Sequence, residues 1–137
     1  MKVLVDTSVW SLALRRSHPD GQNPYVRELR ELINELRVQM VGPVRQELLS
    51  GVRHQASFER LRDALRAFPD LVLESCDFER AAEFFNESVA KGVQGSNTDF
   101  LLCALADRHG LPILTTDKDF LHFQKILPLT LHQPRSF

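Results

Sequence analysis

The sequence is poor in cysteine and contains no long apolar run. Its 137 residues include 2 cysteines, which are too few for a disulfide framework and are typical of a reducing compartment. No apolar stretch approaches the length of a membrane-spanning helix, and Asp6 interrupts the short apolar run after Lys2 that otherwise resembles the start of a signal peptide. We therefore expect a cytoplasmic protein that does not associate with membranes.

Several familiar site motifs are absent as well. No cysteine or histidine pair stands at the spacing of zinc ligands. The chain has no Gly-x-Ser-x-Gly nucleophile elbow, no Gly-x-x-x-x-Gly-Lys phosphate loop and no Gly-x-Gly-x-x-Gly fingerprint. The formal net charge is −1, so any binding of nucleic acid must depend on local basic patches.

Short apolar strands alternate with helical patterns along the chain. We predict strands at residues 3–5, 38–41, 71–73 and 113–114, with a short last strand at 129–131. Helices are predicted at residues 8–14, 25–36, 44–49, 57–68 and 98–109, from Ser75 or Asp77 through Val89, and as a turn or short helix at 117–123. This alternation, without internal repeats, predicts a single α/β domain over residues 1–137, with a mostly parallel sheet covered by helices on both faces.

Two of the predicted strands each lead into an aspartate. Residues 3–5 precede Asp6, and residues 113–114 lead through two threonines to Asp117. In parallel α/β sheets, ligands bind beyond the carboxyl ends of the strands, so these carboxylates share one edge if the two strands are neighbours. Each acid also has a structural explanation: Asp6 as an acceptor for nearby backbone amides, and Asp117 as the cap of the following helix.

Two further acids have weaker signals. Glu47 lies on a short helix that directly follows a strand, and a solvated side chain would explain it. Asp99 lies in the first turn of a helix, where the helix dipole favours an acid and Asn97 or Thr98 can be the N-cap. As a group the acids are more informative, because clustered carboxylates repel one another unless a cation lies among them. A set of oxygen ligands suits Mg²⁺ or Mn²⁺.

Four segments, in order, resemble the acidic motifs of the PIN domain family: VLVDTSVW, VRQELLSG, NTDFLLCALA and ILTTDKDF. Over nearly its full length the chain is similar to the VapC-type toxin ribonucleases of bacterial toxin–antitoxin pairs. The acids of the family correspond to Asp6, Glu47, Asp99 and Asp117, with Asp119 as a supporting fifth acid, Ser8 as the hydroxyl after the first aspartate, and Thr115 and Thr116 as the small polar residues before the fourth. Where family members often carry proline or alanine, this chain has Ser96-Asn97-Thr98.

This resemblance implies a three-layer α/β/α PIN-like fold and an endoribonuclease that uses Mg²⁺ or Mn²⁺ to cleave tRNA or other translation-related RNA. It implies two protein partners, a VapB-like antitoxin and a second copy of the chain in a homodimer. The metal ligands would be Asp6, Glu47, Asp99 and Asp117, supported by Ser8, Thr116 and Asp119, while Arg15, Arg16, Arg45 and Lys118 are candidates for binding RNA outside the metal site.

Other classes remain open at this point. Dehalogenase-type phosphatases need Asp-x-Asp after the first strand, and receiver domains need adjacent acids there, whereas Asp6 stands alone. A non-catalytic PIN-like module that binds RNA or protein is the main alternative, although all four acidic positions are kept. Trp10 belongs either to the core or to an exposed contact for a partner.

Overall fold

The computed structural model describes residues 1–15 and 23–136. Its centre is a three-stranded parallel sheet of β1 (Val3–Val5), β2 (Val38–Gln39) and β3 (Ile113–Leu114), in the order β2-β1-β3. All residues of the three strands are buried, as expected for short apolar strands covered on both faces. Because β1 and β3 are neighbours, with Val5 paired to Leu114, the acids that follow them share one edge of the sheet.

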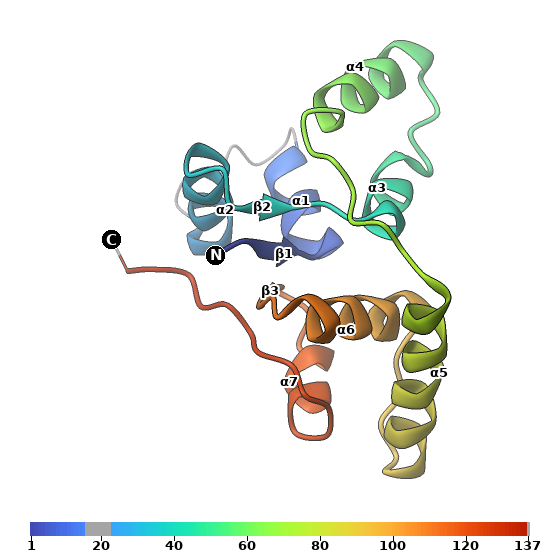
Figure 1. The fold of residues 1–137 in the computed structure, drawn as a ribbon. Coiled ribbons are helices and arrows are strands. Elements are labelled where there is room, and N and C mark those ends of the chain that lie inside the picture. The colour runs from blue at the N-terminus through green and yellow to red at the C-terminus, as the bar shows by residue number, and fades with distance from the viewer. Residues whose placement is uncertain (16–22, 137) are drawn as a thin grey trace.

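Seven helices surround the sheet in the described part of the chain. They are α1 (Thr7–Leu14), α2 (Pro24–Asn34), α3 (Gly42–Leu49), α4 (Gln55–Leu65), α5 (Ser75–Ala90), α6 (Asn97–His109) and α7 (Asp119–Gln124). Figure 1 shows α1 and α2 together on one side of the strands and α5 and α6 on the other, with α3 and α4 extending away from both. The predicted three-layer α/β/α arrangement is confirmed. None of the helices described is long and apolar enough to cross a lipid bilayer.

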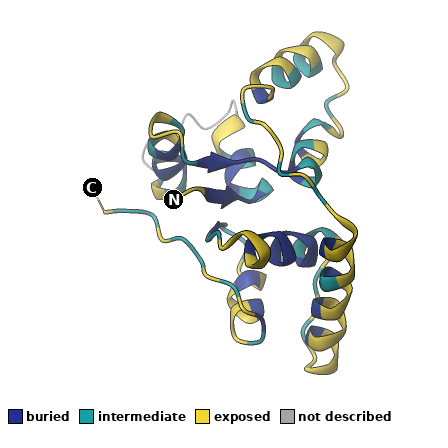
Figure 2. Ribbon diagram, in the orientation of Figure 1, coloured by how far each residue is buried: buried dark blue, intermediate teal, exposed yellow. Residues whose placement is uncertain are grey.

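Helix α6 is the most deeply buried helix, and it carries one of the predicted site acids. Every residue at positions 100–106 is buried, and Figure 2 shows most of this helix in dark blue. A surface helix has a single apolar stripe, but α6 lies between the strands and α5, so residues 100–106 are buried all round (Figure 1). The ring of Phe100 contacts that of Phe123 with centroids 5.0 Å apart, which fastens α7 to α6.

Trp10 belongs to the core. It is 4% exposed, and its ring meets the edge of Phe68 at a centroid distance of 5.3 Å. Burying a large apolar side chain of this kind stabilises the fold by about 2–3 kcal/mol. Trp10 is therefore not the exposed partner contact that the sequence left open.

Two predicted strands are wrong. Residues 71–73 and 129–131 form no strand, and each region contributes a single parallel bridge, Met40 with Asp70 and Ile113 with Leu131. Val72 is 76% exposed, so the 71–73 segment has no second face against the core. Short apolar runs give the same signal in extended loops and in strands. The proline and glycine residues at 17–24 predict a loop, which lies mostly outside the described residues.

Candidate functional site

Asp6 stands at the N-cap position of α1, directly after β1, but its carboxylate caps nothing. Its side chain is nearly buried, at 7% exposure for the residue. The hydroxyls of Ser8 and Thr115 both lie 2.8 Å from the same oxygen, Oδ2. An N-cap aspartate normally accepts a hydrogen bond from the first helical turn, so a carboxylate that does not do so indicates a role other than helix capping. The interpretation of Asp6 as an acceptor for nearby backbone amides is wrong.

The protons of the two hydroxyls can be assigned from their other partners. Ser8 Oγ accepts from the backbone N–H of Thr116 at 3.1 Å, and Thr115 Oγ1 accepts from the backbone N–H of Asp117 at 3.0 Å. Each hydroxyl has a single hydrogen, which is therefore donated to Asp6. The two hydrogen bonds to Oδ2 hold the Asp6 carboxylate in one orientation.

The roles of the two threonines differ from the prediction. We expected Thr116 to support the acids through its side chain, but the structure uses only its backbone N–H, and the hydroxyl that reaches Asp6 belongs to Thr115. The sheet register explains this, because Val5 pairs with Leu114 and the next residues along the two strands are Asp6 and Thr115. Ser8, which the resemblance gives a supporting role, donates to Asp6. A sequence alone does not give the register.

Asp99 lies in the first turn of α6 and forms a capping box with Ser96. The Asp99 N–H donates to Ser96 Oγ at 3.0 Å, and the Ser96 N–H donates to Asp99 Oδ2 at 3.2 Å, so Ser96 is the N-cap rather than Asn97 or Thr98. Burial raises the pKa of Asp99, and the nearby carboxylates of Asp6 and Asp117 raise it further. This mutual influence means that acids from three separate segments lie near one another.

Asp117 and Asp119 form a turn at the start of α7. Asp117 Oδ1 accepts the backbone N–H of Asp119 at 2.9 Å, but the N-cap residue of α7 is Lys118, so Asp117 bonds to the start of the helix from one position before the cap. Asp119 is exposed and supports the site through its backbone. Within the described residues, each of the three clustered acids has one oxygen that receives no hydrogen bond: Oδ1 of Asp6, Oδ1 of Asp99 and Oδ2 of Asp117. Those three oxygens are available to a ligand.

Glu47 lines a groove whose lining does not include the three clustered acids. It is exposed on α3 and lines a groove of about 720 Å³ between α1, α3 and α4, together with Ser11, Arg15 and Arg60. No residue in the described part of the chain donates a hydrogen bond to its carboxylate. The structure thus brings together Asp6, Asp99 and Asp117, whereas Glu47 lines the groove between α1, α3 and α4.

The four predicted RNA-binding cations differ in their surroundings. Arg15 is exposed in the groove beside Glu47, and Lys118 is exposed next to Asp117. Arg45 is occupied: its guanidinium donates to both carboxylate oxygens of Asp70 and to the backbone carbonyls of Leu65 and Phe68. These bonds fix the segment after α4 and argue against the predicted role of Arg45 in binding RNA. Arg16 lies outside the described residues.

The chemistry of the donor set fits a hard divalent cation. The available ligands are carboxylate oxygens, whose mutual repulsion a cation would relieve. Cys103 lies one helical turn after Asp99, but burial raises the pKa of its thiol, so it does not supply a thiolate. Within the described ranges, no group of three or more acidic, histidine or cysteine side chains is arranged closely enough to hold a metal ion by itself. Mg²⁺ usually keeps several waters in proteins, so an ion here would be held partly through water.

The fold and the acid cluster agree with a comparison of the chain with known families. The family model of the PIN domain matches residues 3–126. The chain therefore belongs to the PIN domain family.

Relatives that are similar in sequence are VapC ribonucleases. A VapC ribonuclease of Mycobacterium bovis and ribonuclease VapC11 of Mycobacterium tuberculosis are each 34% identical over 122 residues, covering 86% of this chain and 88% of theirs. The fold is similar to VapBC2 from Rickettsia felis bound to promoter DNA, with a TM-score of 0.75 and 20% identity over 96% of this chain and 98% of that one. FitAcB from Neisseria gonorrhoeae gives a TM-score of 0.75 and 22% identity over 96% and 97%. The predicted resemblance to VapC-type PIN domains is confirmed.

Proposed function

We propose that this VapC-type PIN domain protein is an endoribonuclease that uses Mg²⁺ or Mn²⁺ to hydrolyse RNA phosphodiester bonds. The observation that carries the proposal is the cluster of Asp6, Asp99 and Asp117, in which each carboxylate keeps one oxygen without a protein donor. Anionic RNA would be repelled by such a cluster alone, so the proposal requires a cation there.

Each acid has a distinct part in this proposal. Bound metal would lower the pKa of a water molecule and offset the charge that develops on the phosphate. Asp6, fixed by Ser8 and Thr115, would be the central ligand, and Asp99 and Asp117 would complete the site directly or through water. Glu47, reaching from α3, would orient the attacking water or hold a second ion. Lys118, exposed beside Asp117, would contact a phosphate of the RNA.

We also propose that the chain is the toxin of a VapBC-type pair, acting in the cytoplasm on tRNA or another translation-related RNA. Two structural relatives are a VapBC2 assembly and a FitAB assembly, each bound to DNA, which supports an antitoxin partner. The groove that contains Glu47 and Arg15 would receive a segment of that antitoxin, which would block Glu47. A cytoplasmic location agrees with the two free thiols, Cys76 and Cys103.

A homodimer is proposed on separate grounds. Helix α5 exposes three apolar side chains at helical spacing, Phe78 at 54%, Phe85 at 36% and Val89 at 47%. An apolar stripe of this kind on a surface helix is typical of a contact with another chain. We assign it to the second copy.

Cleavage of a labelled single-stranded RNA by the purified chain tests the enzymatic proposal. We expect cleavage with Mg²⁺ or Mn²⁺, none with EDTA, and a loss of more than about 100-fold in Asp6→Asn, since even supporting residues of metal sites typically contribute 10–100-fold. Asp63→Asn, an exposed acid on α4, is the matched control and should cleave normally. Equal cleavage by the wild type and Asp6→Asn would defeat the catalytic assignment and favour the binding-module alternative.

A further inference from the structure

A second cavity adjoins the acid cluster on the side of the C-terminal segment. Its volume is about 340 Å³, and its lining joins Asp117 and Lys118 to Tyr25 of α2 and to His132 and Gln133. Asp117 therefore contributes both to the acid cluster and to this cavity. A ligand held here lies directly beside the proposed metal site.

We propose that this cavity is a nucleobase subsite, in which one base of the RNA stacks on Tyr25 and meets the polar side chains of His132 and Gln133. The inference rests on the proposed function and adds to it the residues that position the substrate. Single-stranded RNA is generally bound through bases that stack on aromatic rings and hydrogen-bond along their edges, while cations at the rim contact the phosphates. Tyr25 offers the ring and Lys118 the cation.

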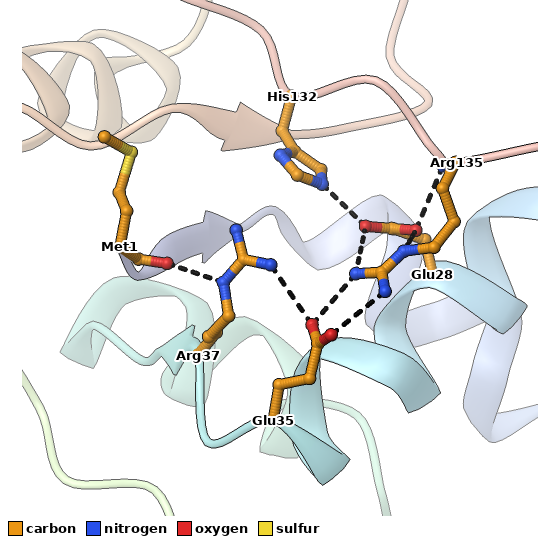
Figure 3. Close-up of polar contacts among 6 residues, drawn as sticks. All are labelled: Met1, Glu28, Glu35, Arg37, His132 and Arg135. Atoms are coloured by element: carbon orange, nitrogen blue, oxygen red, sulfur yellow. Dashed lines mark hydrogen bonds and ion pairs between the residues drawn. The ribbon is translucent and has the colours of Figure 1, made fainter.

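The wall of this cavity is anchored by a buried acid that takes no part in the proposed chemistry. Glu28 is fully buried on α2, one turn after Tyr25. Its carboxylate accepts from Arg135 Nε at 2.9 Å, from the Arg135 backbone N–H at 3.1 Å and from His132 Nε2 at 2.7 Å. Figure 3 shows the C-terminal segment crossing α2 with both basic side chains directed at Glu28.

A second acid completes the anchor. Arg135 also bonds to both oxygens of Glu35, at 3.0 and 2.9 Å, and Arg37 joins Glu35 to the backbone carbonyl of Met1 (Figure 3). Together these bonds tie the C-terminal segment to α2 and to Glu35, which follows α2. They hold residues 132–135 in one place, as a specific binding wall requires.

The same bonds decide which edge of His132 faces a ligand. Glu28 can only accept, because its pKa is lowered, so His132 Nε2 is the donor in their hydrogen bond. The ring is thereby fixed in orientation, and Nδ1 is the polar atom left for other partners. The backbone N–H of Tyr25 donates to the Asn23 side chain at 2.9 Å, which fixes the backbone of Tyr25 at the start of α2. Pre-formed surfaces of this kind lose little entropy on binding.

RNA binding by the inactive Asp6→Asn chain tests the subsite apart from cleavage, using fluorescein-labelled single-stranded RNA of mixed sequence. We expect Tyr25→Ala in that background to weaken binding by about 5- to 150-fold, the range for losing one base–aromatic stack. Tyr25→Phe should bind within about twofold of the Asp6→Asn chain, because the ring stacks without its hydroxyl. Gln133→Ala, at an exposed position, should also weaken binding, and Val72→Ala, remote and exposed, should not.

In the cleaving chain, the same substitution at Tyr25 should raise KM with little change in kcat. A lowered Tm would reveal a folding defect in Tyr25→Ala. Tyr25 is the only tyrosine of the sequence, so its NMR resonances report directly on stacking in the Asp6→Asn chain. Unchanged RNA affinity in both Tyr25→Ala and Gln133→Ala, or Tyr25 resonances that do not move with RNA, would overturn the subsite. If Tyr25→Ala cleaves RNA with a normal KM, the subsite is overturned and the enzymatic proposal stands. If RNA binds tightly and this binding depends on Tyr25, but the wild type does not cleave it, only the enzymatic proposal is overturned.

Discussion

The hydroxyl of Thr115 donates to Asp6 Oδ2 at 2.8 Å, although the two residues are 109 positions apart in the chain. This bond joins the ends of β1 and β3 and fixes the orientation of the carboxylate that we propose as the central metal ligand. Thr115 thus differs in its role from its neighbour Thr116, which contributes only a backbone N–H, donated to Ser8.

Substituting the two threonines one at a time tests that difference. We expect Thr115→Val to lower kcat and the affinity for Mn²⁺ by about 10- to 100-fold, as is typical when a partner of a metal ligand is removed. Thr116→Val keeps the backbone N–H and should stay within about twofold of the wild type. Steady-state cleavage and a Mn²⁺ titration measure both values. Similar losses in the two variants would contradict the assigned roles.

The repulsion among the acids predicts an unusual effect on stability. Without metal, Asp99→Asn should raise the free energy of unfolding, because it removes a charge disfavoured by burial and by Asp6 and Asp117, while the amide oxygen can still accept the Ser96 N–H. The same change should abolish the rise in Tm that Mn²⁺ gives the wild type. Thermal unfolding with and without Mn²⁺ measures both effects. A variant less stable than the wild type without metal, or one that Mn²⁺ still stabilises, would count against the cluster.

The sequence predicted the position of the cluster better than its details. Asp6 and Asp117 follow two apolar strands, so a shared sheet edge could be expected, and the β2-β1-β3 order confirms it. The choice between Thr115 and Thr116 depends on strand register, which short apolar strands do not specify. The bond between Glu28 and Arg135 spans 107 positions, and nothing local marks either residue as a partner of the other.

Arg45 and Lys118 should respond differently to substitution. Arg45 bonds to Asp70 and to the carbonyls of Leu65, which ends α4, and of Phe68, so Arg45→Ala should lower the free energy of unfolding by about 2 kcal/mol without changing the salt dependence of RNA binding. Lys118→Ala should leave stability nearly unchanged and reduce the slope of log K against log salt by about 1, as expected when one phosphate contact is lost. Denaturant unfolding and RNA titrations at several salt concentrations distinguish them. A reduced slope in Arg45→Ala would restore its predicted role in binding RNA.

Glu28 gives the fold a defined dependence on pH. Burial alone would raise its pKa, but hydrogen bonds from Arg135 and His132 outweigh burial and lower the pKa from 4.5 to about 2. A lowered pKa stabilises the fold fully above about 4.5, and the stabilisation is lost as the pH falls towards 2. The difference, 4.5 minus 2, corresponds to about 3 kcal/mol at neutral pH.

The variant Glu28→Gln isolates this contribution. It should unfold more easily than the wild type by about 3 kcal/mol at pH 7, with the gap narrowing steadily between pH 4.5 and pH 2, where the wild-type carboxylate takes up its proton. Urea unfolding at several pH values measures the gap, and Glu87→Gln, at an exposed position on α5, is the control that should show none. Because the same carboxylate fixes the wall of the proposed base cavity, Glu28→Gln should also raise the KM for RNA at neutral pH. A gap that does not change with pH would show that the lost stability comes from packing rather than from the charge of Glu28.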